Sequence, residues 1–304
     1  MTPLDPHALE CLAAIVEEGG FERAAARLSI TQSAVSQRLR TLEAQAGTVL
    51  IVRSRPLRPT AAGRLLLRHA MQLRLLRADL EHDLHGLAPG AASAREEERI
   101  SIAVNADSIA TWALPALTPL VTAGLPLEII ADDQEFTQVW LREGQVLGCV
   151  TALPQALRGC KVVPLGVMPY VAVAHPAYAA AHAPRGLTAH GARSMAFIAF
   201  NRKDELQARF VRRAFRLPRV ALNQRFVPSA EGQVQAVLAG WGACVVPELQ
   251  VRSLLAAGAL VDLAPGTVLP VELYWHCWNL DSGVLDSLTR ALTEAAAQAL
   301  VAPA

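Results

Sequence analysis

Short polar side chains and two arginines are concentrated between residues 32 and 40. They are Gln32, Ser33, Ser36, Gln37, Arg38 and Arg40. Serine and glutamine side chains near the start of a helix can approach base edges and phosphates in the major groove of DNA, and arginine side chains can contact phosphates or guanine. This chemistry predicts contacts with double-stranded DNA.

Charge is distributed very unevenly along the chain. Residues 23–77 hold eleven arginines and one acid, Glu43, which gives this segment a charge of +10. The other residues hold 17 basic and 26 acidic side chains, a charge of −9, so the net charge of +1 conceals two oppositely charged parts. A basic first quarter on an acidic remainder favours a DNA-binding head joined to a body with another task. The alternative is that these arginines only form a solvated helical face, but an excess of ten positive charges argues against it.

Four acids in the remainder fall where a predicted strand is followed by a predicted helix. They are Asp107, Asp132, Asp133 and Glu231. In α/β proteins such junctions face the cleft in which ligands bind. Each acid alone is compatible with a helix N-cap or a solvated loop charge. Together they favour a cationic ligand held by charge-assisted hydrogen bonds, with Thr151 and Asn201 at the ends of other strands as further candidates.

The DNA-contacting residues need a helix that can enter the major groove. Apolar spacing predicts helices at residues 7–18, 21–28 and 32–45. Thr31 is suited to cap the third helix, and Ile30 and Val35 stand at the two positions of a hydrophobic staple. Two short helices joined by a tight turn predict a helix-turn-helix unit.

A basic segment follows this unit. Residues 49–53 are rich in β-branched side chains, and residues 53–58 form a basic turn interrupted by proline. The pattern predicts a wing that lies along the DNA backbone. Arg53, Arg55 and Arg58 are therefore expected to contact phosphates.

A long helix is predicted to begin at Thr60 and to end near Gly90, followed by a linker at 91–98. Its apolar residues gather on one side, at Leu65, Leu66, Leu67, Ala70, Leu73, Leu76, Leu80, Leu84 and Leu87. The first sixty residues offer too little core to cover so long a stripe, although packing on its own domain is the alternative. A symmetric pair of these helices is therefore expected to form a dimer.

From residue 99 onward, predicted strands alternate with helices. Strands are expected at 100–104, 127–131, 147–151, 162–165, 171–174, 197–200, 225–227, 243–246 and 271–278. Helices are expected at 108–122, 134–143 and 282–298. The alternation predicts an α/β body with mainly parallel sheets, and about two hundred residues are enough for two lobes.

The head resembles that of LysR-type transcriptional regulators without a gap over about sixty residues. The matching positions are Phe21-Glu22-Arg23-Ala24-Ala25, Leu28, Thr31 to Gln37, Leu42-Glu43, Gly47, Leu50, Arg53, Thr60 and Gly63. Gly20 stands where the family usually has a serine cap, and Ile51 where it usually has phenylalanine. Both departures are tolerable, because glycine also caps helices and isoleucine still fills a core.

The body resembles the arginine- and lysine-responsive branch of that family, the ArgP/LysG type. The matching segments are 103–108, 110–112, 229–231, 262–266 and 273–276. The resemblance implies a periplasmic-binding-protein-like effector domain that senses L-lysine or L-arginine, and a regulator that activates an exporter gene for basic amino acids. Asn105, Asp107, Ser108, Ser229 and Glu231 lie in these segments and are expected to bind the effector. Helices starting near Ser108 and Ser229 would direct N–H groups at the carboxylate of the amino acid.

The predicted organisation is a winged helix-turn-helix domain at 1–60, a linker and dimerisation helix at 61–90 and an effector-binding domain at 91–304. Lobe I is expected at about 99–168 and 269–304, and lobe II at about 169–268. A homodimer or homotetramer that controls the access of RNA polymerase to a promoter is expected. Ligand occupancy would act by shifting the placement of the heads.

Other classes of protein are disfavoured. The charge-free run 162–184 contains four prolines and cannot form a membrane-spanning helix, and residues 1–10 lack the basic start of a signal peptide, so a cytoplasmic location is expected. Five widely spaced cysteines without a C-x-x-C pair argue against a disulfide framework or a zinc site. No cofactor, metal or catalytic residue is predicted, because no phosphate loop, H-E-x-x-H or G-x-S-x-G occurs.

The rival hypothesis that stays open is an architectural protein that coats or bends DNA, for example at a replication origin, without a sensory role. The acidic, two-lobed body argues against it, because coating DNA does not need a ligand cleft.

Overall fold

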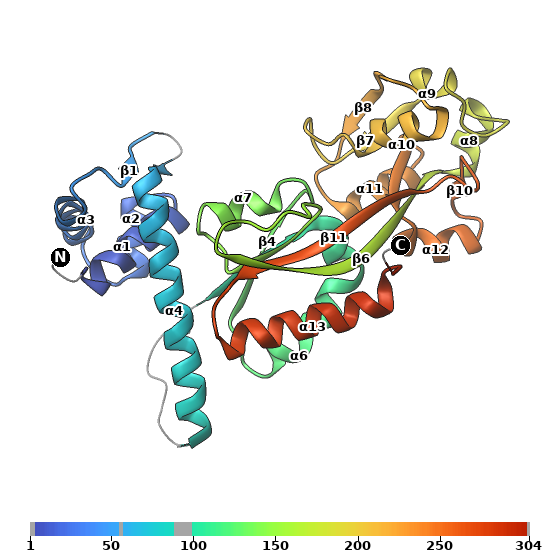
Figure 1. Ribbon diagram of the computed structural model, residues 1–304. Helices are drawn as coiled ribbons and strands as arrows, with labels where there is room; N and C mark the ends of the chain where they lie inside the picture. Colours follow the sequence, from blue (N-terminus) through green and yellow to red (C-terminus); the bar gives the residue numbers. More distant parts are fainter. Residues whose placement is uncertain (1–3, 55–56, 88–98, 303–304) are drawn as a thin grey trace.

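The computed structural model describes residues 4–54, 57–87 and 99–302 (Figure 1). The chain forms an N-terminal head and a larger α/β body, and the long helix α4 (Ala61–Leu87) lies between them. The head also contains α1 (Pro6–Glu17), α2 (Phe21–Arg27), α3 (Gln32–Ala46) and the antiparallel strands β1 (Ile51–Val52) and β2 (Arg58–Pro59). No helix in these ranges is both long and apolar enough to cross a membrane.

The three head helices begin and end within one residue of their predicted positions, because local signals set their ends. Asp5 accepts a hydrogen bond from the backbone N–H two residues on at the start of α1, at 3.0 Å. Thr31 accepts one from the N–H three residues on at the start of α3, at 3.2 Å. Gly47 ends α3 with a φ of 67° in the left-handed region, which glycine adopts at little cost. Val35 is fully buried, and Ile30 packs against the same core.

α4 packs on both the head and the body. Leu67 and Ala70 belong to the core of the head, whereas Met71 and Leu75 belong to the core of the body. The apolar stripe is therefore only partly covered by the head, as expected, and α4 also packs on the body within the same chain. Among the stripe residues whose side chains the structure describes, Leu65, Leu76 and Leu80 stay exposed.

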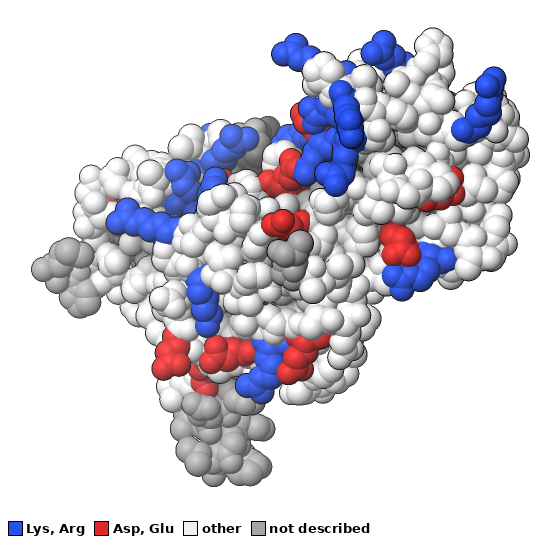
Figure 2. All heavy atoms as spheres, turned by 45° about the vertical axis from the view of Figure 1, so that its right-hand side comes forward, with Lys and Arg blue, Asp and Glu red and all other residues white. Residues whose placement is uncertain are grey.

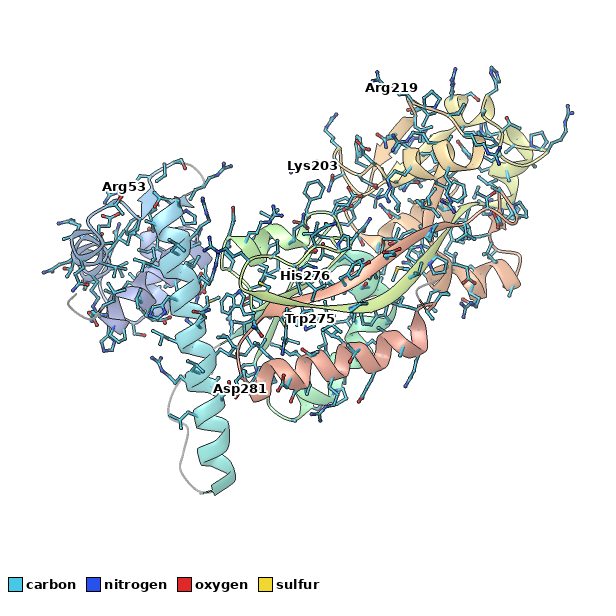
Figure 3. The ribbon with its side chains drawn as sticks, in the orientation of Figure 1. Arg53, Lys203, Arg219, Trp275, His276 and Asp281 are labelled. Carbon is cyan, nitrogen blue, oxygen red and sulfur yellow. The ribbon has the colours of Figure 1, made fainter. Side chains whose placement is uncertain are left out.

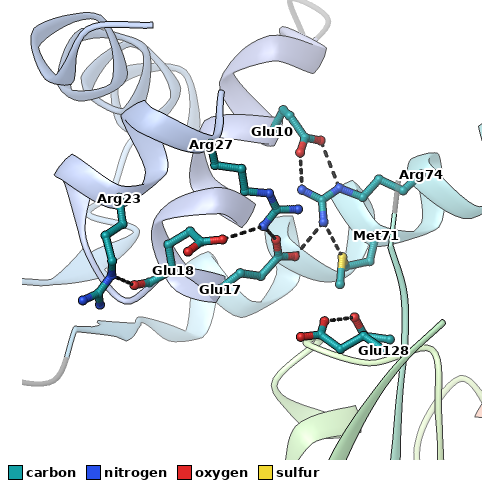
Figure 4. Close-up of polar contacts among 9 residues, drawn as sticks. Glu10, Glu17, Glu18, Arg23, Arg27, Met71, Arg74 and Glu128 are labelled. Atoms are coloured by element: carbon teal, nitrogen blue, oxygen red, sulfur yellow. Dashed lines mark hydrogen bonds and ion pairs between the residues drawn. The ribbon is translucent and has the colours of Figure 1, made fainter. Parts of the chain in front are cut away.

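A buried arginine joins α4 to the head. Arg74 is 4% exposed, and its guanidinium group pairs with the carboxylates of Glu10 and Glu17 on α1 (Figure 4). Burial alone would lower the pKa of Arg74, but the carboxylates of Glu17 and Glu10 raise it above its ordinary value. The arginine therefore stays charged between the two acids.

A second set of contacts joins α4 to the body. The Asp79 carboxylate accepts a hydrogen bond from the backbone N–H of Val284 at 3.1 Å, in the first turn of α13 (Gly283–Ala299). A Cβ added at Gly144 would lie 3.0 Å from the backbone nitrogen of Arg68, so the two backbones are in close contact. α4 is thus fixed to the body at two separate places.

Nine strands of the body form one continuous sheet in the order β4-β3-β5-β11-β6-β9-β7-β8, and β10 also pairs with β6. Their bounds are β3 (Ile100–Asn105), β4 (Leu127–Asp132), β5 (Gly148–Thr151), β6 (Cys160–Ala174), β7 (Ala196–Ala199), β8 (Asn223–Phe226), β9 (Ala243–Pro247), β10 (Val261–Asp262) and β11 (Leu269–Trp278). β3 is parallel to β4 and β5, and β7 is parallel to β8 and β9. β6 and β11 are antiparallel to all their neighbours, so the prediction of mainly parallel sheets is wrong for the centre.

The two long central strands connect the two halves of the body (Figure 1). Lobe I contains β3, β4 and β5, and lobe II contains β7, β8 and β9; β6, predicted as two short strands, is one strand of 15 residues. The pairing of β6 with β11 shifts register between Leu273 and Tyr274, which leaves Leu165 as an extra residue. The adjacent Gly166 has a φ of 138°, where an L side chain would be strained. This bulge lies where the strands pass from one lobe to the other.

Helices cover both faces of the sheet. Besides α13 they are α5 (Ala106–Ser108), the π-helix η1 (Ile109–Ala113), α6 (Leu114–Thr122), α7 (Thr137–Arg142), α8 (Pro176–His182), α9 (Gly191–Ser194), α10 (Leu206–Phe215), α11 (Ala230–Leu238) and α12 (Glu248–Ala256). The helix predicted from residue 108 thus begins at Ala106 and includes a π-helical turn. α13 and α6 lie side by side against lobe I (Figure 1). The largest core side chains are Trp275, Trp278, Tyr170, Phe197 and Phe210.

Replacing Arg74 by methionine is expected to lower the free energy of unfolding by about 2–4 kcal/mol, because two partly buried carboxylates lose their common cation. Urea denaturation measures the change. The matched control is Arg252→Met, which removes an exposed pair with Glu248 and should leave the midpoint unchanged. Equal midpoints for both variants would contradict the structural role of Arg74.

Candidate DNA-contacting surface and effector cavity

One face of α3 is free to enter a DNA groove. The opposite face is buried through Val35, Leu39 and Leu42. Of the six residues predicted to contact DNA from this helix, four are exposed: Gln32, Ser33, Gln37 and Arg40. The other two, Ser36 and Arg38, are half-buried.

Arg38 differs from Arg40 in its surroundings. The guanidinium group of Arg38 lies 4.0 Å from the Cys11 sulfur on α1, so the side chain turns toward the head itself. Arg40 makes no such contact within the part of the chain that the structure describes, and it is exposed. Arg40 is therefore the better probe of a charge contact made by α3.

The wing is anchored to the head around Leu50, whose backbone N–H donates to the Glu43 carboxylate at 2.9 Å. Glu43, the one acid of the basic segment, is thus used within the head. Arg53 is exposed, with its guanidinium carbon 5.5 Å from the centre of the Phe21 ring, and Arg58 is exposed on β2. Arg55 lies outside the described residues.

Four aspartates line a cavity between the two lobes of the body. The cavity measures about 20 Å³, and its polar lining is contributed by Asp107, Asp132, Asp133, Asp204, Gln134, Gln207 and Gln233. Ala106, Phe200 and Leu206 complete it. No lysine, arginine or histidine is among these lining residues. A space of this size holds about one water molecule, so a larger cation requires the lobes to move apart.

The carboxyl ends of parallel strands bring these acids together. Asp107 follows β3, Asp132 ends β4 with Asp133 next to it, and Asp204 follows β7 in the opposite lobe. The hydroxyl of Tyr170, on the crossing strand β6, donates to Asp107 at 2.6 Å. The site therefore depends on both lobes and on a strand that connects them.

Each of the other three carboxylates accepts a hydrogen bond from a nearby backbone N–H group, and Asp132 also accepts one from a side chain of α7. Asp132 accepts hydrogen bonds from the Asp133 backbone N–H at 2.8 Å and from the indole N–H of Trp140 at 3.0 Å. Asp133 accepts from the backbone N–H of Glu135 at 2.8 Å. Asp204 accepts from two backbone N–H groups of its loop, at 2.8 and 2.9 Å. These bonds fix the carboxylates in place without neutralising them.

Burial and mutual repulsion raise the pKa values of two of the acids. Burial raises the pKa of Asp133 to about 7, with further contributions from the negative charges of Asp204, Glu135 and Asp107. Burial likewise raises the pKa of Asp107 to about 6, with contributions from Asp204 and Glu231, although the bond from Tyr170 acts in the opposite direction. A cation in the cavity would stabilise the ionised form of each acid and so lower both pKa values.

Several predicted effector residues do not line this cavity. Ser229 caps α11, and Glu231 is exposed beside it. The Thr151 hydroxyl is buried and donates to the backbone oxygen of Gln134 at 2.9 Å, so it supports the loop behind the cavity. Asn105 and Ser108 are fully buried, and their side-chain polar atoms have no partner among the described residues. Their predicted contacts with the ligand stay predictions.

Asp204 was not singled out from the sequence. It lies in the run Arg202-Lys203-Asp204-Glu205, which is typical of a solvated loop of mixed charge. Only its position after a short apolar run, which is strand β7, could have indicated that it faces the cleft. Gln207 and Gln233 lie inside helices and carried no such signal.

A larger groove lies next to the cavity and shares Asp132 with it. Its volume is about 440 Å³, and it is lined by Asp132, Phe136, Val139, Trp140, Glu143, Asn201, Arg202 and Lys203. Of the predicted residues, Asp132 and Asn201 thus meet here. Figure 2 shows Lys and Arg side chains gathered at the top of the face that it presents, with acids just below them.

Two known domain families match the chain. "Bacterial regulatory helix-turn-helix protein, lysR family" matches residues 6–64, and "LysR substrate binding domain" matches residues 93–300. The HTH-type transcriptional regulator ArgP of Aeromonas salmonicida is 41% identical over 301 residues, which cover 99% of each chain.

Two solved structures are similar over the full length. ArgP from Mycobacterium tuberculosis is 41% identical with a TM-score of 0.81, covering 99% of this chain and 100% of that chain. Full-length LysG from Corynebacterium glutamicum, solved with bound effector Arg, is 35% identical with a TM-score of 0.71, covering 98% of this chain and 99% of that chain.

A DNA-binding head fixed by a long helix to a two-lobed body with a polar cavity defines a class of transcriptional regulator. The chain belongs to the LysR family of transcriptional regulators, and within it to the ArgP/LysG type. This membership confirms the resemblance found in the sequence, the fold class and the prediction of a regulator rather than an enzyme.

The raised pKa of Asp133 predicts a pH-dependent cost to folding. An acid that holds its proton more tightly in the folded chain destabilises the fold once the pH rises past its unfolded pKa, and the cost is complete above its folded pKa of about 7. Asp133→Asn keeps an acceptor for Glu135 and removes this cost. Relative to wild type, its free energy of unfolding should rise by about 2–3 kcal/mol between pH 5 and pH 8.

Urea denaturation at pH 5, 6, 7 and 8 measures this difference. Asp281→Asn, at an exposed position outside the cavity (Figure 3), is the control and should stay parallel to wild type over the whole range. If the difference in the free energy of unfolding between Asp133→Asn and wild type were the same at every pH, the pKa of Asp133 would not be raised by folding.

Proposed function

We propose that this regulator senses a basic amino acid, L-arginine or L-lysine, in the cavity between its lobes. The observation that carries the proposal is a lining of four aspartates without a cationic side chain. Such a lining suits a guanidinium or ammonium group, because each carboxylate can form a charge-assisted hydrogen bond with it. The arginine bound to the similar LysG of Corynebacterium glutamicum supports the same ligand class.

The predicted division of labour is retained as part of the proposal. Residues 1–60 bind promoter DNA and residues 61–90 pair two copies, while residues 91–304 bind the effector, with lobe I at about 99–168 and 269–304 and lobe II at about 169–268. The exposed Leu65, Leu76 and Leu80 offer an apolar surface for a homodimer or homotetramer.

Ligand binding would act through the relative placement of the lobes. A cation that binds the aspartates of both lobes favours the arrangement in which they surround it, and it can shift the protein only by this difference in affinity. α4 is fixed to lobe I, so each head would move together with lobe I relative to lobe II. The expected result in the cytoplasm is altered promoter bending and access of RNA polymerase, with activation of a basic amino-acid exporter gene.

Replacing Arg40 by alanine is expected to lower DNA affinity about tenfold and to reduce the slope of log affinity against log salt by about one, because one phosphate contact is lost. Electrophoretic mobility shifts with the promoter upstream of the regulated gene, at several salt concentrations, measure both values. Arg252→Ala, on the exposed side of α12, is the control. An unchanged salt dependence would show that Arg40 does not contact the backbone.

Replacing Asp107 by asparagine should weaken L-arginine binding at pH 8 at least about tenfold, because a buried charge partner is removed while an acceptor for Tyr170 is kept. Isothermal titration calorimetry measures the affinity, and a mobility shift without amino acid should give wild-type DNA binding. Unchanged arginine affinity would overturn the site. If none of the twenty amino acids stabilises the wild-type protein in a thermal-shift screen, the architectural rival is favoured.

A further inference from the structure

Cations join the acids of the lining along the path from the cavity to the groove. The cavity contains only acids as charged side chains, whereas the groove next to it includes Arg202 and Lys203. Asp132 lines both spaces and therefore marks the boundary between them. A ligand that extends from the cavity into the groove meets only acids at its inner end, and two cations beside the acids at its outer end.

Lys203 is the cation placed to meet the outer end. Its ammonium nitrogen lies 5.1 Å from the centre of the Phe136 ring, so a residue of lobe II reaches over the loop before α7 of lobe I. Figure 3 shows Lys203 between α7 and lobe II. Lys203 has no carboxylate partner among the residues that the structure describes. Its charge is thus available to a ligand.

Arg202 is occupied differently. Its guanidinium carbon lies 5.2 Å from the centre of the Phe226 ring, on the strand β8 of lobe II, so its contact is within its own lobe. The acid Glu143 also lines the groove, but its carboxylate accepts a hydrogen bond from Gln145 at 2.8 Å. Lys203 is the groove cation that spans the two lobes.

We propose that Lys203 determines specificity by binding the α-carboxylate of the effector and so selects basic amino acids over the diamines that lack this group. The inference rests on the proposed function. The distal cation lies among Asp107, Asp133 and Asp204, and the α-ammonium group lies beside Asp132, whose oxygens each retain acceptor capacity. The carboxylate then points outward to Lys203.

A diamine of the same length would be rejected on electrostatic grounds. The inner cation of the diamine suits the aspartates equally well. Its outer end has no carboxylate to pair with Lys203, and its second amine brings a positive charge near the Lys203 ammonium group. Repulsion between like charges across this partly enclosed groove weakens binding, and the favourable charge-assisted bond is lost as well. Acidity of the cavity alone would favour the more positive diamine, and a cation at the groove opposes this by favouring the carboxylate of the amino acid.

The test compares L-arginine with agmatine, its decarboxylated counterpart, by calorimetry on the full-length protein at pH 8. Wild type should bind L-arginine more tightly. Lys203→Met, which keeps most of the side-chain length, should reduce the ratio of arginine to agmatine affinity at least tenfold, chiefly by weakening arginine. Lys203→Arg should retain the preference, because it retains the charge.

The control is Arg219→Met, which removes an exposed cation at the far tip of lobe II (Figure 3) and should leave the ratio unchanged. An unchanged ratio in Lys203→Met, with arginine still bound, overturns the role of Lys203 and leaves the proposed function intact. Failure of wild type to bind arginine or lysine at all overturns the proposed function and this inference together.

Discussion

Four carboxylates share a cavity that contributes no positive charge of its own, and this is the constraint around which the body is organised. Buried like charges repel, and two of the acids respond with pKa values raised by burial, to about 6 and about 7. The fold keeps them close because each is fixed by a hydrogen bond from a neighbouring N–H or O–H donor. A site that is costly without a cation is, for the same reason, favourable toward one.

The sheet topology makes that arrangement possible. β3 and β4 in lobe I and β7 in lobe II end at the same crevice, and the antiparallel pair β6 and β11 crosses between the lobes. The bulge at Leu165 and the positive φ of Gly166 interrupt the regular pairing at the crossing. Tyr170 lies four residues beyond Gly166 and donates to Asp107, so the crossing strand also contacts the site directly.

The sequence predicted the features that local signals control. The cap at Thr31 and the staple of Ile30 and Val35 involve residues close together in the sequence, and the charge of residues 23–77 can be counted directly. The helices of the head were therefore predicted closely. Asp107, Asp132 and Asp133 were found because each follows a recognisable strand. Asp204 and Lys203 were missed because they are neighbours in a charged loop. Only the tertiary packing places Asp204 in the lining of the cavity and Lys203 in the lining of the groove. The antiparallel direction of the crossing strands was not predicted either, because hydrophobic periodicity and composition do not encode strand direction.

The path from cavity to DNA is determined by what α4 touches. The head is held by Arg74 through Glu10 and Glu17, and the body is held by Asp79 at the first turn of α13 and by Met71 and Leu75 in its core. α13 packs on α6 and η1 of lobe I, so the head is joined to the lobe that carries Asp107, Asp132 and Asp133. A ligand that changes the separation of the two lobes therefore moves lobe II relative to the head. In an assembly where lobe II contacts another copy, that displacement would be transmitted to the DNA through the neighbouring head.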